Sequence, residues 1–257
     1  MTDSNVFLIH SGGSGYGGTY WESWGTDCLV MKDFEISSPL PNKHHDYNDI
    51  GLAVHGYLER YYKYGHTHRL QFEFDDDWQL TPELDQQAWD MFQGYIESDI
   101  IQNIGEVLGV EEQLEGELFE GSFGIAPFTG RIDLRVRRPD GIYIIDWKTC
   151  SSWSADPEDD LHKYGYGSYK TARIRYCHGA NVLGLGPITG MIFIQIKKTK
   201  TPQFRELPPV PLRLEEVVAY KRYLQFCKDR KENYPREFMF KQCAYCRYQK
   251  MCSKGAY

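Results

Sequence analysis

Acidic and basic side chains meet at the end of an apolar segment in the middle of the chain. Residues 144–148 read IIDWK, so Asp146 follows two isoleucines and Lys148 stands two residues further on. In an extended strand, residues two apart point to the same face, which brings Asp146 and Lys148 side by side. Burying such charges is costly unless a cation or a substrate uses them. The pair is therefore a candidate catalytic or binding group.

A second acid, Asp133, stands thirteen residues before Asp146 in the segment GRID. The sequence RPDG at 138–141 separates the two acids and predicts a hairpin turn, so both carboxylates can converge on one spot. Carboxylate oxygens are the ligands that Mg²⁺ and Mn²⁺ prefer. Such an ion lowers the pKa of an attacking water and neutralises charge on a phosphodiester, and a nearby lysine ammonium stabilises developing charge. The pattern predicts a Mg²⁺ or Mn²⁺ site.

The periodicity of apolar residues predicts the elements that carry this group. We expect the following order: helices at 48–64 and from Thr81 to 104, strands at 109–119, 130–138 and 141–149, a helix at 165–182, a strand at 189–197, a proline-rich connection at 202–211, and a helix at 213–232. Within 141–149, Ile142, Ile144 and Asp146 share one face. This order predicts an α/β fold with a central mixed sheet flanked by helices.

The acids and the lysine form two motifs, G-x-x-D ending at Asp133 and D-x-K-T starting at Asp146. Upstream, GLAVH at 51–55 places a histidine four residues after a glycine on a predicted helix. Together these motifs resemble the signature of the RecB-like PD-(D/E)XK nucleases. The resemblance implies a restriction-endonuclease-like core, and we expect one nuclease domain spanning 1–257.

The same resemblance implies a role for each matching residue. His55, Asp133 and Asp146 are expected to bind the metal ion through their side chains, and Trp147 through its backbone carbonyl. Lys148 is the expected catalytic lysine. Glu111, in VEEQL, falls where relatives often carry an auxiliary strand glutamate.

One family motif is incomplete. The family continues with Q-x-x-x-Y on a helix; Tyr176 matches the tyrosine, but Ala172 stands in the place of the glutamine. The DNA-positioning role of that glutamine is then absent or taken over by Lys170 or Arg173 on the same helix.

Four of the seven cysteines form a candidate metal-binding set. Cys243, Cys246 and Cys252 follow the pattern C-x₂-C-x₅-C, and crowding three thiolates is unfavourable without a metal. With Cys28, this arrangement resembles the iron–sulfur staple of the AddB subunit and of the CRISPR-associated Cas-four exonucleases. The resemblance implies a 4Fe–4S cluster that joins the N- and C-terminal segments; four thiolates would also satisfy zinc.

Charge is distributed unevenly along the chain. Residues 1–130 hold 5 Lys and Arg against 23 Asp and Glu, whereas 131–257 hold 24 against 13. A basic half suits phosphate contacts, although both halves could equally be solvated faces. Candidate DNA contacts are Arg131, Arg135, Lys170, Arg173 and Tyr176. Trp147, Trp153 and Tyr169 are candidates for stacking on unpaired bases, with the hydrophobic core as the competing role.

The expected activity is that of a metal-dependent DNA nuclease. The resemblance favours a single-strand DNA exonuclease or end-processing enzyme in recombination, repair or spacer acquisition. The alternative is a non-catalytic DNA-binding or scaffold subunit of a helicase–nuclease or integrase complex. The sequence has no apolar run of about 18 residues and no secretory signal, so we expect a cytoplasmic protein without a membrane partner.

Overall fold

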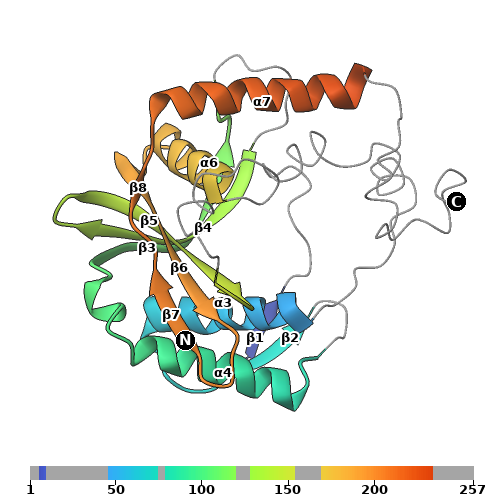
Figure 1. Cartoon of the computed structure of the whole chain (residues 1–257), viewed down its shortest axis with the longest axis vertical. Helices are drawn as coiled ribbons and strands as arrows, with labels where there is room; N and C mark the ends of the chain where they lie inside the picture. Colours follow the sequence, from blue (N-terminus) through green and yellow to red (C-terminus); the bar gives the residue numbers. More distant parts are fainter. Residues whose placement is uncertain (1–5, 10–45, 75–78, 120–127, 154–168, 234–257) are drawn as a thin grey trace, which may run out of the picture.

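The computed structural model of the chain describes residues 6–9, 46–74, 79–119, 128–153 and 169–233 (Figure 1). Its elements follow in this order: β1 (Val6–Ile9), α3 (Asp46–Tyr64), β2 (Gln71–Phe74), α4 (Pro82–Ile96), the 3₁₀ helix η1 (Ile101–Asn103), β3 (Glu106–Gly116), β4 (Phe128–Arg138), β5 (Gly141–Cys150), α6 (Tyr169–Val182), β6 (Ile188–Lys197), β7 (Gln203–Glu206), β8 (Val210–Pro211) and α7 (Leu214–Asn233). The helices and strands predicted around the two acidic motifs are confirmed.

A mixed sheet forms the centre of the molecule. Its strands lie in the order β3-β4-β5-β6-β7, and β8 pairs with β6. The neighbours β3, β4 and β5 are antiparallel, β6 runs parallel to β5, and β7 and β8 are antiparallel to β6. Helices α3 and α4 lie on one side of this sheet and α6 and α7 on the other (Figure 1). The predicted α/β class with a central mixed sheet is confirmed.

Each face of the sheet has its own hydrophobic core. Tyr143, Ile145 and Trp147 of β5 pack with α3 and α4, whereas Ile144 and Phe193 pack with α6 and α7. This alternation follows from the period of two in a strand and confirms the predicted faces of β5. None of the described helices is long and apolar enough to cross a membrane.

Three features differ from the elements expected from the sequence. Helix α4 ends at Ile96 because Ser98 Oγ donates to the Tyr95 carbonyl (2.7 Å), which offers the backbone an alternative to another helical turn. The proline-rich connection contains β7, whose residues 203–206 include no proline, and the two-residue edge strand β8, which includes Pro211. The short parallel pair of β1 and β2 was not predicted.

Candidate active site

The site forms where β4 and β5 separate. Their ladder ends at the pair Leu134 and Ile145. Beyond it, the backbone N–H of Trp147 donates to Asp133 Oδ2 (2.9 Å) instead of to a strand carbonyl. The carbonyl oxygen of Trp147 lies 3.0 Å from Nε2 of His55. Both backbone groups of Trp147 therefore point into the gap where the two strands part.

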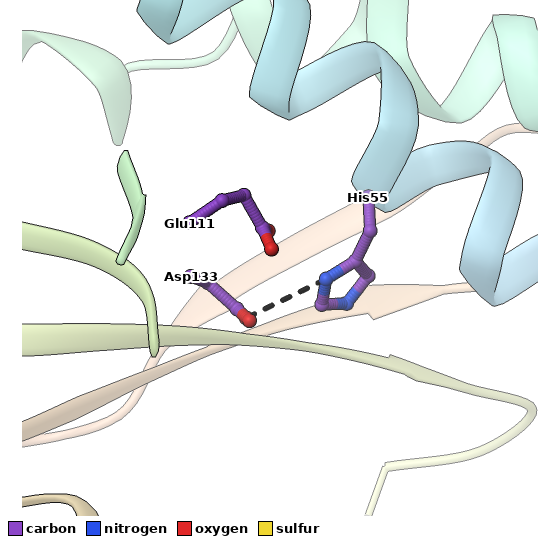
Figure 2. A group of neighbouring side chains, drawn as sticks. All are labelled: His55, Glu111 and Asp133. Atoms are coloured by element: carbon purple, nitrogen blue, oxygen red, sulfur yellow. Dashed lines mark ion pairs between the residues drawn. The ribbon is translucent and has the colours of Figure 1, made fainter. Parts of the chain in front are cut away.

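Three potential metal ligands converge on this gap from three elements. His55 extends from α3, Glu111 from β3 and Asp133 from β4, and their ligand atoms all lie within 4.8 Å of one another. Figure 2 shows the three side chains pointing toward one another, with His55 Nδ1 3.6 Å from Asp133 Oδ2. Glu111 has a φ of 51°, in the left-handed region that non-glycine residues rarely adopt. Such strain often accompanies function, and here it accompanies a side chain aimed at the site.

The contacts of His55 favour positive charge, from a proton or a metal ion, between its ring and Asp133. A carbonyl oxygen only accepts hydrogen bonds, so in the neutral ring Nε2 carries the proton and donates to Trp147. Nδ1 then presents a lone pair to the Asp133 carboxylate. Two lone pairs facing each other at 3.6 Å are unfavourable unless the ring is protonated or a metal ion lies nearby. One imidazole nitrogen and several carboxylate oxygens form a donor set that suits Mg²⁺ or Mn²⁺.

The two carboxylates of this group are destabilised in their charged forms. The pKa of Glu111 is raised to about 8, chiefly by burial; the negative charge of Asp133 raises it by more than the positive charge of Arg131 lowers it. Burial also raises the pKa of Asp133; His55 opposes this shift and Asp146 adds to it. Folding thus brings together acids that bind protons, or a cation in their place, more readily than exposed acids.

Asp146 and Lys148 form an ion pair beside the three ligands. Asp146 is 5% exposed, and its Oδ2 lies 2.5 Å from Lys148 Nζ. Asp146 is not a member of the group of mutually close ligand atoms. Burial alone would lower the pKa of Lys148, but Asp146 and Asp133 raise it above its usual value, and Tyr176 adds to this effect. Lys148 is therefore cationic at neutral pH, and Tyr176 lies near enough to influence it.

The indole ring of Trp147 is part of the core. It is fully buried, stacks on Tyr62 at 5.5 Å and meets the edge of His55 at 6.0 Å. Of the two roles that the sequence left open for this ring, packing in the hydrophobic core is the one observed, because no face of the ring reaches solvent. Its contacts instead hold β5 and α3 in the arrangement that aligns His55 with the Trp147 carbonyl.

Most of the candidate DNA contacts are paired with acids. Arg131 Nε lies 2.8 Å from Glu111, and Arg135 makes two 2.8 Å hydrogen bonds to Glu112. Arg131 is still largely exposed, with 62% of its side chain accessible. These two pairs cross from β4 to the neighbouring β3.

The expectation that Arg173 contacts DNA is contradicted by its burial. Arg173 is 1% exposed and makes two 2.9 Å hydrogen bonds to Glu216 on α7. Lys170 Nζ lies 3.5 Å from the same carboxylate. Both side chains join α6 to α7, which leaves Arg173 unable to replace the glutamine missing at Ala172.

Two of the three described cysteines are core residues. Cys177 and Cys227 are buried among the side chains of α6 and α7, and burial raises the pKa of the Cys177 thiol to about 12. Cys150 is partly exposed at the end of β5. The predicted cluster ligands, Cys28, Cys243, Cys246 and Cys252, lie outside the described residues.

A polar network one strand away from Lys148 was not anticipated. Gln195 lies within the apolar strand β6, where it is 2% exposed, and its Nε2 donates to the hydroxyl of Tyr169 (2.9 Å). Arg205 Nε of β7 donates to Gln195 Oε1 (3.0 Å). The signal in the sequence was the single amide in the run MIFIQIK, since a buried glutamine needs partners.

Comparison with known proteins identifies the class. A family model described as the PD-(D/E)XK nuclease superfamily matches residues 34–253. The chain belongs to this superfamily.

Two solved structures are similar to the chain at low sequence identity. A crystal structure of a candidate exonuclease from Eubacterium rectale has a TM-score of 0.53 at 11% identity, covering 83% of this chain and 80% of that one. A structure named SSO0001 covers 99% and 89% at 13% identity, and its TM-score of 0.41 is too low to carry an argument. The first similarity supports the fold. A search of the curated protein sequences finds no match.

Proposed function

We propose that this nuclease-superfamily member is a divalent-metal-dependent deoxyribonuclease that hydrolyses phosphodiester bonds. The observation that carries the proposal is the convergence of His55, Glu111 and Asp133 beside the Asp146–Lys148 pair. The group holds more carboxylates than the nearby cations balance. A nuclease of this superfamily can use that excess of negative charge to bind a metal ion.

The residues that would hold Mg²⁺ or Mn²⁺ are His55, Glu111, Asp133 and the carbonyl of Trp147, with Asp146 at the side of the group. When bound, such an ion supplies charge neutralisation at the phosphate and makes water a stronger nucleophile. The Trp147 N–H fixes the Asp133 carboxylate in place (2.9 Å). Because its ion pair with Asp146 favours the protonated form, we assign Lys148 the roles of orienting groups and stabilising negative charge.

The proposed substrate is DNA that is single-stranded or has free ends, and the proposed action is exonucleolytic or end-processing. The motif resemblance supports this choice, together with the exonuclease description of the Eubacterium rectale structure. A role in recombination, repair or spacer acquisition, with a helicase or integrase partner protein, belongs to the same proposal. A single nuclease domain spanning 1–257 is also part of this proposal, and the family match over 34–253 supports it.

A cleavage assay tests the proposal. End-labelled single-stranded and double-stranded DNA are incubated with the purified protein in Mg²⁺, in Mn²⁺ and in EDTA, and the products are sized. We expect metal-dependent shortening from an end that is lost in Asp146→Ala and in Lys148→Ala. DNA that is bound but left intact by the wild-type protein in every metal would favour the non-catalytic scaffold instead.

We also propose that Cys28, Cys243, Cys246 and Cys252 ligate a 4Fe–4S cluster. The proposal is supported by the cysteine spacing and the motif resemblance alone. Anaerobic purification followed by iron, sulfide and zinc analysis tests it. We expect about four irons per chain, lost in Cys246→Ser and retained in the control Cys227→Ser. Stoichiometric zinc without iron would replace the cluster with a zinc site.

A further inference from the structure

Basic side chains near the site differ in whether an acid neutralises them. In the part of the chain that the structure describes, each of the following arginines is paired with a carboxylate: Arg131 with Glu111, Arg135 with Glu112, Arg137 with Glu106, Arg138 with Glu206 and Arg173 with Glu216. Arg205 makes no such pair there. No carboxylate of the described residues neutralises its charge.

Neutral groups hold the guanidinium of Arg205 in place. Its Nε donates to Gln195 Oε1 (3.0 Å), and its Nη2 donates to the same oxygen. Its Cζ lies 4.7 Å from the ring centre of Trp153, a cation–π distance. Gln195 is itself held by Tyr169, whose ring stacks on Phe193 at 4.4 Å. This support fixes the guanidinium without cancelling its charge.

The bonds to Gln195 leave one edge of the guanidinium unused. They engage Nε and one N–H of Nη2, so both N–H groups of Nη1 and the second of Nη2 remain. Nη1 and Nη2 form the fork that binds two oxygens of a phosphate at once. A second cation, Lys197, lies 5.6 Å from the Trp153 ring centre.

The strand register connects this guanidinium to the candidate active site. Lys148 of β5 is paired in register with Gln195 of β6, and Gln195 is paired with Arg205 of β7. Registered residues point to the same face of a sheet, so the three side chains form a row across three strands. With neighbouring strands about 4.8 Å apart, the ends of the row are separated by about 10 Å. One bound DNA strand can span that distance.

We propose that Arg205, held by Gln195 and Trp153 and assisted by Lys197, binds a second phosphate of the substrate strand whose reacting phosphate lies at Lys148. This inference rests on the proposed function for the identity of the substrate. It deepens the proposed function, because it gives the bound strand a path across the sheet from β5 to β7. Arg205 is a binding residue, and Gln195 and Trp153 are positioning residues.

DNA binding, measured under conditions that prevent cleavage, tests this site. The anisotropy of a labelled single-stranded oligonucleotide of about 16 nucleotides is recorded in EDTA with the full-length protein. The titration is repeated from about 50 to 200 mM salt, because each phosphate contact contributes about 0.7 to the slope of log affinity against log salt for single strands. The variants are Arg205→Gln and, as a matched control, Arg213→Gln, which changes an exposed arginine just before α7.

We expect Arg205→Gln to bind about tenfold more weakly and to reduce the slope by about 0.7. Arg213→Gln should change neither quantity. An unchanged slope in Arg205→Gln, or equal losses in both variants, would overturn the proposal. Arg205→Lys, which keeps the charge but not the fork, should recover the slope and only part of the affinity.

A second variant separates binding from folding. Gln195→Glu preserves acceptors for Arg205 but pairs its guanidinium with a negative charge. We expect this variant to lower the salt slope as Arg205→Gln does while its thermal unfolding stays cooperative; wild-type binding by folded Gln195→Glu would refute the role of the unpaired charge. If DNA binding depends on Arg205 but no metal supports cleavage, the proposed nuclease function fails and the phosphate site stands. If cleavage requires Asp146 but DNA binding does not depend on Arg205, the proposed nuclease function stands and the phosphate site at Arg205 fails.

Discussion

Two clusters of charged side chains lie on this fold, and they differ in balance. Between α6 and α7, Glu216 faces two cations, Arg173 and Lys170. Where β4 and β5 separate, three acids, Glu111, Asp133 and Asp146, face two cations, Lys148 and the exposed Arg131, and the imidazole of His55. The first cluster is satisfied by its own side chains. The second has acids in excess, although it is bounded by core residues.

The pKa shifts report this difference. Burial raises the pKa of Glu216, but the hydrogen bonds and charges of Arg173 and Lys170 together outweigh this effect, so the net shift is downward. Burial raises the pKa of Glu111 to about 8, and Arg131 does not compensate. A charge cluster that stabilises the fold thus favours its ionised form, whereas this candidate active site maintains acids that favour a bound cation.

The sharpest separation of the two clusters comes from matched acid-to-amide changes. Asp133→Asn removes a metal ligand but keeps an acceptor for the Trp147 N–H, so we expect cleavage to fall about 1000-fold, or about 4 kcal/mol in activation free energy, without loss of stability. Glu216→Gln should lower stability and leave the rate per folded molecule unchanged. Initial cleavage rates and urea denaturation of both variants check this. Equal losses of activity in the two variants would contradict the distinction between a catalytic and a structural cluster.

Breaking the α6–α7 cluster should cost stability. Arg173→Met leaves Glu216 without its two hydrogen bonds, and we expect the free energy of unfolding to fall by about 3 kcal/mol. Adding Glu216→Leu should not restore that loss, because Lys170 then loses the carboxylate that it faces. Glu106→Gln, which breaks an exposed pair with Arg137, is the control and should change stability by less than about 0.5 kcal/mol. Equal losses in Arg173→Met and Glu106→Gln would remove the distinction.

The dependence of stability on pH should have opposite signs at the two clusters. The folded protein holds the Glu111 proton up to about pH 8, whereas the unfolded chain releases it near the usual 4.5, so without metal this residue makes stability fall as pH rises between these values. The lowered pKa of Glu216 contributes stability that is present above its unfolded pKa and is lost as pH falls through the lowered value. Urea denaturation in EDTA compares wild type with Glu111→Gln. The stability advantage of Glu111→Gln should grow toward pH 8; parallel curves would count against a buried Glu111 that Arg131 fails to compensate.

Sequence reasoning located the residues whose placement depends on local geometry. The hairpin and the alternation within a strand bring Asp133 near Asp146 and Lys148, and helical spacing aims His55 at the sheet. The sequence does not predict contacts between elements that lie far apart in the chain. Arg173 looks like a free cation until α7 supplies Glu216, and Arg205 reaches the row with Lys148 only through the register of β6 with both neighbours. The position of Glu111 in the site depends on a left-handed residue in β3, which no local pattern predicts for a glutamate.

Calorimetric titration of Mn²⁺ into the metal-free protein tests the central claim most directly. The variants are Asp133→Asn and Glu111→Gln, and the control is Glu106→Gln, which alters an acid on the same strand as Glu111. The excess of acids where β4 and β5 separate predicts that wild type and Glu106→Gln bind the ion alike and that both site variants bind it at least about tenfold more weakly. Wild-type affinity in Asp133→Asn, or no binding by the wild-type protein, would contradict it.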